Sequence, residues 1–139
     1  MKKILIIHGP NLNLLGKHGL SKFKTLTKIN YHILVESKKL NYEVDIKQSN
    51  SESEIIDLIH NNNFDILICN LSSFELTSIA IRDAITSISK PFHRVIFDNI
   101  FYHSNFLSDF NKLSYFDDIS ISTFTGQNEL PYIKLLSTI

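Results

Sequence analysis

The sequence has few of the features that would place it outside ordinary globular domains. Its single cysteine, Cys69, excludes a disulfide within the chain. Because Cys69 lies inside an apolar run, we expect a buried, unreactive thiol, and a reducing, cytoplasmic compartment. The 14 basic residues balance the 14 acidic ones, so the formal net charge is zero. This balance favours neither a nucleic-acid partner nor an anionic membrane surface.

Long apolar runs and ligand-binding signatures are also missing. No stretch approaches the roughly 18 apolar residues of a membrane span, and the apolar run that follows Lys2 and Lys3 is too short for a signal-peptide core. We therefore expect no membrane partner and no processing. The chain lacks G-x-G-x-x-G and G-K-[ST] loops, which argues against a dinucleotide or phosphate site of those kinds. His8, His32 and His60 do not suggest a metal site, so no metal is expected.

Over the length of one domain, the sequence alternates short apolar runs with longer segments of helical period. A chain of 139 residues with 43% hydrophobic content is long enough for one core, so we predict a single domain over residues 1–139. Short apolar runs predict strands and segments of helical period predict helices. The expected strands are 3–8, 42–48, 65–70, 92–97 and 119–123; the expected helices are 25–40, 51–60, 75–87 and 130–136, with a shorter piece at 104–112.

The first, third and fourth strands are apolar almost throughout, as a parallel sheet covered on both faces requires. The pattern predicts a doubly wound α/β domain, in which ligands bind beyond the carboxyl ends of the strands. The stretch "HGPNLNLLG" at residues 8–16 falls at that edge. It is either a ligand-binding turn or a structural one, shaped by Gly9 and Pro10 and capped by Asn11. Ser51 and Glu54 predict a capping box at the start of the second helix.

Three blocks in this order resemble the type II 3-dehydroquinate dehydratases: "ILIIHGPNLNLLG", "KQSNSESEIIDLIHN" and "LTSIAIRDAI". The resemblance implies a flavodoxin-like five-stranded parallel sheet with helices on both faces. It also implies a homo-oligomer of trimers and dodecamers, without cofactor or metal. The implied reaction is the anti elimination of water from 3-dehydroquinate to give 3-dehydroshikimate.

Several positions keep the family's pattern. The resemblance implies that Asn11 holds the water that stabilises the enolate. It implies that Asn70 at the end of the third strand binds substrate, and that Asp83 reaches the site of a neighbouring subunit. Ser78 closes the third-helix motif, and the backbone amides of Phe97 and Asp98 correspond to those that bind the substrate carboxylate. Asn11 and Asn70 also have a structural alternative, the satisfaction of backbone groups, and Asp83 could instead pair with Arg82.

Other positions depart from the pattern. Phe23 stands where the family has its tyrosine base, and His18 stands where it has the arginine that lowers the pKa of that tyrosine. Ile96 replaces the histidine general acid. Leu76 and Leu107 replace a substrate-binding histidine and arginine, and Asp98 brings a negative charge toward the substrate carboxylate.

Realignment does not restore the missing groups. His93 lies three residues before Ile96 and therefore on the opposite face of the strand. Tyr31 is expected in the packing or rim of the first helix rather than as a substitute base, and Tyr102 and His103 in a solvated loop. Two classes of function stay open: an impaired dehydratase, with His18 or His103 in the missing roles, and a non-catalytic homologue that keeps the fold and oligomer for binding or scaffolding.

Overall fold

The computed structural model describes residues 1–98 and 114–139, and it has one five-stranded sheet at its centre. All strand pairs are parallel and the order is β2-β1-β3-β4-β5, which is the flavodoxin-like arrangement. The strands are β1 (Lys2–His8), β2 (Tyr42–Gln48), β3 (Ile66–Asn70), β4 (Phe92–Phe97) and β5 (Ser122–Gly126).

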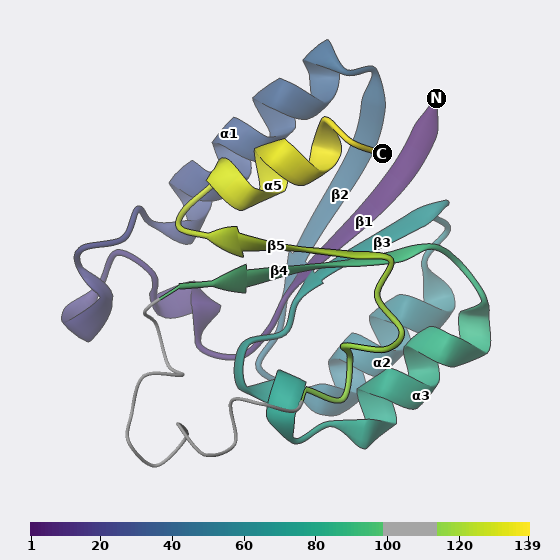
Figure 1. Ribbon diagram of the computed structural model, residues 1–139. Helices are drawn as coiled ribbons and strands as arrows, with labels where there is room; N and C mark the ends of the chain where they lie inside the picture. The colour runs from purple at the N-terminus through teal and green to yellow at the C-terminus, as the bar shows by residue number, and fades with distance from the viewer. Residues whose placement is uncertain (99–113) are drawn as a thin grey trace.

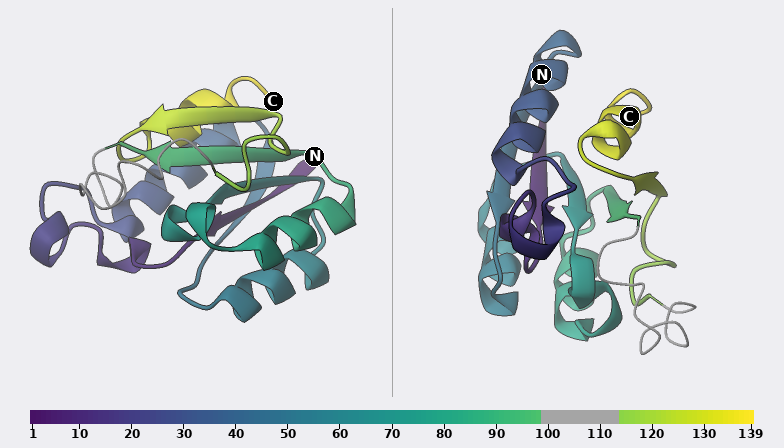
Figure 2. Two further views of the ribbon diagram at one scale, coloured as in Figure 1. Left: turned by 60° about the horizontal axis from the view of Figure 1, so that its bottom comes forward. Right: turned by 90° about the vertical axis from the view of Figure 1, so that its left-hand side faces the viewer.

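Helices cover both faces of this sheet (Figure 1). α1 (Leu26–Lys39) and α5 (Leu130–Leu136) lie on one face, and α2 (Glu52–Asn61) and α3 (Ile79–Ile88) lie on the other. The side view separates the two helical layers clearly (Figure 2). Among the described helices none is long and apolar enough to cross a membrane.

Two apolar cores follow from the alternation of side chains along the strands. Ile4 and Ile6 of β1 point toward α1 and α5, whereas Leu5 and Ile7 point toward α2 and α3. Every residue of β3 is buried, as a central parallel strand requires, while the edge strand β2 alternates between exposed and half-buried positions. Cys69 is buried in the core beneath α2 and α3, as predicted.

Hydroxyl side chains begin three of the helices. Thr25 Oγ1 accepts from Lys28 N at 3.3 Å, Ser51 Oγ from Glu54 N at 3.3 Å, and Ser78 Oγ from Ile81 N at 3.0 Å. The predicted capping box at Ser51 is only half formed, because the Ser51 N–H donates to Ser49 Oγ at 3.0 Å and not to Glu54.

Two predicted boundaries were wrong. The predicted helix 75–87 is split into a 3-10 helix, Ser72–Leu76, and α3, because Ser78 has non-helical backbone angles and caps a new start. The predicted strand 119–123 begins at Ser122 instead, because turn hydrogen bonds from the amides of Ile119 and Ser120 to the Phe116 carbonyl come first. The helical piece expected at 104–112 lies outside the described residues, as do Tyr102, His103 and Leu107.

Candidate functional site

The turn after β1 is packed closely against the end of β3. Gly9 N donates to the Asn70 carbonyl at 2.7 Å, and a Cβ on Gly9 would lie 2.5 Å from the Leu71 carbonyl oxygen. Only glycine therefore fits at this position without a shift of the backbone. The turn holds Asn11 in a left-handed conformation, φ 68°, and the backbone N–H of Asn11 donates to Asn50 Oδ1 at 2.9 Å.

Asn11 lies at the edge where a ligand is expected. Its side chain is exposed and makes no capping hydrogen bond, although the residue occupies the N-cap of the short helix Leu12–Leu14. The structural alternative for Asn11, in which its side chain caps the turn, is therefore not what the fold uses. An amide held in place through its backbone, with its side chain exposed, can hold a water or a ligand.

Asn70 is buried at the end of β3 and takes part in a polar chain. Its Nδ2 donates to the Tyr132 hydroxyl at 3.0 Å, and that hydroxyl lies 3.0 Å from His8 Nδ1. His8 Nε2 lies 3.0 Å from Asn30 Oδ1 on α1. Burial lowers the pKa of His8 to about 4 and raises the pKa of Tyr132 above its usual range, so both side chains are uncharged at neutral pH.

Phe23, at the position of the family's base, is built into the core. It is 4% exposed, and its ring stacks on Phe97 with centroids 6.5 Å apart. Phe97 in turn meets Tyr132 edge to face at 6.0 Å. These rings form an apolar wall beside Asn70, and a phenyl ring cannot accept a proton.

Near the end of β4, the position of the family's acid carries no proton-transfer group. Ile96 is half-buried, and His93 lies on the opposite face of the strand, as predicted, where Nδ1 is 2.7 Å from Ser122 Oγ. The Asp98 amide donates to the Gly126 carbonyl at 2.9 Å, so it is engaged in pairing with β5. The proposed use of the Phe97 and Asp98 amides for a carboxylate stays a prediction.

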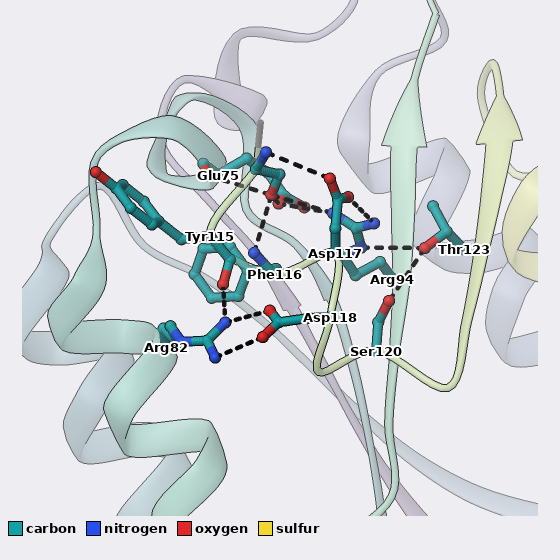
Figure 3. A network of polar contacts seen from close by, with 10 residues as sticks. Glu75, Arg82, Arg94, Tyr115, Phe116, Asp117, Asp118, Ser120 and Thr123 are labelled. Atoms are coloured by element: carbon teal, nitrogen blue, oxygen red, sulfur yellow. Dashed lines mark hydrogen bonds and ion pairs between the residues drawn. The ribbon is translucent and has the colours of Figure 1, made fainter. Parts of the chain in front are cut away.

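Arg94, two residues before Ile96 on β4, is the centre of an ionic network in which the Arg94–Glu75 pair is buried (Figure 3). Its Nη1 is 3.0 Å from Glu75 Oε2 and its Nη2 is 2.6 Å from Asp117 Oδ1. Nε donates to Thr123 Oγ1 at 3.1 Å, and the Ser114 hydroxyl donates to Glu75 Oε2. Burial raises the pKa of Glu75, while the Arg94 charge pulls it down. Glu75 Oε1 is buried without a hydrogen-bond partner in the described structure.

Arg82 is also occupied. Its guanidinium contacts both carboxylate oxygens of Asp118, at 2.5 and 2.9 Å, and the Tyr115 carbonyl at 2.5 Å (Figure 3). Among the described ion pairs Arg82 is joined to Asp118 and not to Asp83, so the expected Asp83–Arg82 pair is not formed. Asp83 is exposed on α3. Arg82 and Arg94 are the two arginines of the chain. Each already has a carboxylate partner within the fold.

Some candidates are placed elsewhere. Ser78 is 1% exposed, and its Oγ caps α3. His18 is exposed on the short helix His18–Leu20. Tyr31 is 64% exposed on α1, where it lines a hollow of about 550 Å³ beside the amino end of β2, not the carboxyl edge. Within residues 1–98 and 114–139 no three potential metal-ligating side chains come together.

Sequence reasoning missed Tyr132, Glu75 and Arg94. His8 and Tyr132 are 124 residues apart, and Glu75 and Arg94 are 19 apart, so no local spacing links them. The only signal was chemical, since a polar residue inside an apolar strand or helix needs a buried partner.

Comparison with known proteins agrees with this geometry. The sequence model of the family Dehydroquinase class II matches residues 2–139. The 3-dehydroquinate dehydratase of Legionella pneumophila (strain Corby) is 38% identical over 144 residues, covering 100% of this chain and 97% of the relative. That of Caldanaerobacter subterraneus subsp. tengcongensis is 41% identical over 143 residues, covering 100% and 94%.

Comparison of the fold with solved structures supports the same family. The crystal structure of the type II dehydroquinase from Butyrivibrio crossotus superposes with a TM-score of 0.84 at 30% identity, covering 99% of this chain and 98% of the other. This chain belongs to the class II dehydroquinase family.

The arrangement has the parts to bind but few to react. Asn11 offers an exposed side-chain amide, and Asn70 an amide that donates to Tyr132. An elimination next to a ketone needs a general base and a general acid, and Phe23 and Ile96 supply neither.

Proposed function

We propose that the chain is a type II 3-dehydroquinate dehydratase of reduced rate, which eliminates water from 3-dehydroquinate to give 3-dehydroshikimate. The observation that carries this proposal is Asn11, whose side chain is exposed at the carboxyl edge of β1 in a turn held by Gly9 and Asn50. In this reaction the Asn11 amide would hold a water against the developing enolate. Membership of the family over the whole chain supports the same assignment.

The rate is reduced because two proton-transfer groups are missing. Each such group contributes roughly 10²- to 10⁴-fold, although the losses need not multiply. The substrate carboxylate also lacks an arginine, since Arg82 and Arg94 have carboxylate partners of their own. A charged hydrogen bond of that kind contributes about 1.5 to 3 kcal/mol.

A second candidate is a non-catalytic homologue that keeps the fold for binding or scaffolding. The burial of Phe23 against Phe97 favours it, because the loop that would carry the base is committed to the core. In either case we propose a homo-oligomer, trimer-based and dodecameric, in the cytoplasm, without nucleic-acid or membrane partners. Asp83 would then enter the site of a neighbouring subunit.

The test is the conjugated-enone absorbance of 3-dehydroshikimate after 3-dehydroquinate is added to purified protein. We expect slow turnover that Asn11→Ala abolishes and that Asn13→Ala, an exposed asparagine of the same turn, preserves. Turnover abolished by His18→Ala or His103→Ala would identify a replacement base or acid and exclude the second candidate. Binding without turnover would support the second candidate, and the absence of both turnover and binding would exclude the dehydratase.

A further inference from the structure

Behind Asn70 the protein builds a polar chain that the reaction does not require for proton transfer. It joins β3, α5, β1 and α1 through Asn70, Tyr132, His8 and Asn30. His8 and Tyr132 are 0% exposed and Asn70 is 2% exposed. The rings of His8 and Tyr132 also meet edge to face, with centroids 5.4 Å apart. A buried chain of this kind holds its members in one orientation, since each polar group lost from it would be left unpaired.

The direction of the hydrogen bonds in this chain follows from one end. Asn30 Oδ1 is an acceptor, so His8 Nε2 must carry the hydrogen. Because the buried ring is neutral at physiological pH, His8 Nδ1 carries a lone pair. The Tyr132 hydroxyl therefore donates to His8 Nδ1, and its oxygen accepts from Asn70 Nδ2.

This direction decides which end of the Asn70 amide is committed. The Nδ2 group is used inside the protein, and no described residue donates to Oδ1. Oδ1 is an acceptor, so it suits a hydroxyl donor and repels a ketone or carboxylate oxygen.

We propose that His8 and Tyr132 are positioning residues that hold Asn70 with its carbonyl oxygen toward the ligand, so that Asn70 selects a ring hydroxyl of the substrate. This role rests on the proposed function, since it takes 3-dehydroquinate as the ligand. His8 and Tyr132 have no exposed surface, so we assign them a role through Asn70 and not by contact with the ligand.

Tyr132→Phe tests the role with almost no change of shape. Without the hydroxyl, Asn70 can present either end of its amide, and we expect 3-dehydroquinate to bind roughly 2- to 12-fold more weakly, as for one lost hydrogen bond. Analogues that each lack one ring hydroxyl give the sharper readout. One of them should bind the wild type more weakly than 3-dehydroquinate does, and this difference should shrink in Tyr132→Phe. Tyr42→Phe is the matched control, because its hydroxyl bonds the Ile139 carbonyl at the other end of the sheet.

A second measurement needs no ligand. Nitrogen-15 NMR of the His8 ring should show a protonated Nε2 and an unprotonated Nδ1 from pH 5 to 8. His8→Phe removes the acceptor and should weaken binding as Tyr132→Phe does, with circular dichroism confirming that each variant is folded.

The outcomes separate the two proposals. Protonation of Nδ1 in place of Nε2, or unchanged affinity and unchanged discrimination in Tyr132→Phe, would overturn the positioning role alone. If the wild type binds no compound while His8 has the expected tautomer, the proposed substrate is wrong and the ligand role of Asn70 falls with it.

Discussion

At the scale of single residues, the two arginines show how burial changes the consequence of the same kind of pair. The Arg94 and Glu75 side chains are 5% and 4% exposed, whereas Arg82 and Asp118 are 26% and 69% exposed. Removing one partner of a buried pair leaves a charge without water or a counter-ion, whereas an exposed ion can turn to solvent. Arg94 is therefore a structural residue, and it is not available for a substrate carboxylate.

Arg94→Met should lower the free energy of unfolding by about 3 to 5 kcal/mol, because Glu75 is left buried without its counter-ion. Urea denaturation monitored by circular dichroism measures this loss, and Arg82→Met, the matched control, should shift the midpoint far less. Adding Glu75→Met to Arg94→Met should recover part of the stability.

The same variant has a predicted pH dependence. Burial already raises the pKa of Glu75, and the loss of Arg94 raises it further. A carboxyl whose folded pKa lies above its unfolded value loses stability as pH rises through that interval. The defect of Arg94→Met should therefore be larger at pH 8 than at pH 5, and an equal defect at both would contradict the account of Glu75.

At the scale of elements, local sequence signals predicted the helix bounds that local interactions determine. The helix over 130–136 was predicted with the observed bounds, and Ser51 marked the start of α2 correctly. The start of β5 was missed because pairing of Ser122 with His93 fixes it, and that contact spans 29 residues. For the site, the sequence indicated Asn11 and Asn70 and the loss at Phe23, whereas the partners of Asn70 depend on the assembled sheet.

Substitution of Ser78 distinguishes a helix-capping role from a ligand-binding role. Its Oγ caps α3 from a position that is 1% exposed, so Ser78→Ala should cost about 1 kcal/mol, and up to about 2. Thr77→Ala, at the exposed neighbour whose Oγ1 donates to the Ser73 carbonyl at 3.4 Å, should cost less than about 0.5 kcal/mol. Equal urea midpoints for the two variants would show that the cap is not needed.

At the scale of the whole molecule, the buried histidine makes stability depend on pH. The pKa of His8 is about 4 in the folded chain and 6.5 as its ordinary value, so the unfolded chain binds the extra proton first. Stability from this group is complete above pH 6.5 and falls as pH decreases toward 4, with a slope of at most about 1.4 kcal/mol per unit. Urea midpoints across this range should show a shallower slope for His8→Gln than for the wild type. His60→Gln, at an exposed histidine, should keep the wild-type slope.

Assembly is the property of the whole molecule that the proposed role of Asp83 requires. Arg82 is turned to Asp118, and no described cation lies within ion-pair distance of the neighbouring Asp83 carboxylate, which is exposed on α3. A carboxylate in this position can serve a second subunit. If Asp83 completes a neighbour's site, Asp83→Asn should weaken 3-dehydroquinate binding roughly 10- to 100-fold, as for one charged hydrogen bond.

Asp57→Asn on α2 makes the same change of charge at another exposed position and should leave the affinity unchanged. Sedimentation velocity should show trimers or multiples of trimers for both variants, so that a loss of affinity in Asp83→Asn reflects the carboxylate and not disassembly. A monomeric wild type that binds 3-dehydroquinate, or an Asp83→Asn variant that binds as tightly as the wild type, would exclude a site shared between subunits. The buried chain from Asn70 to Asn30 would then have to orient the ligand within one subunit, because all four of its side chains come from a single chain.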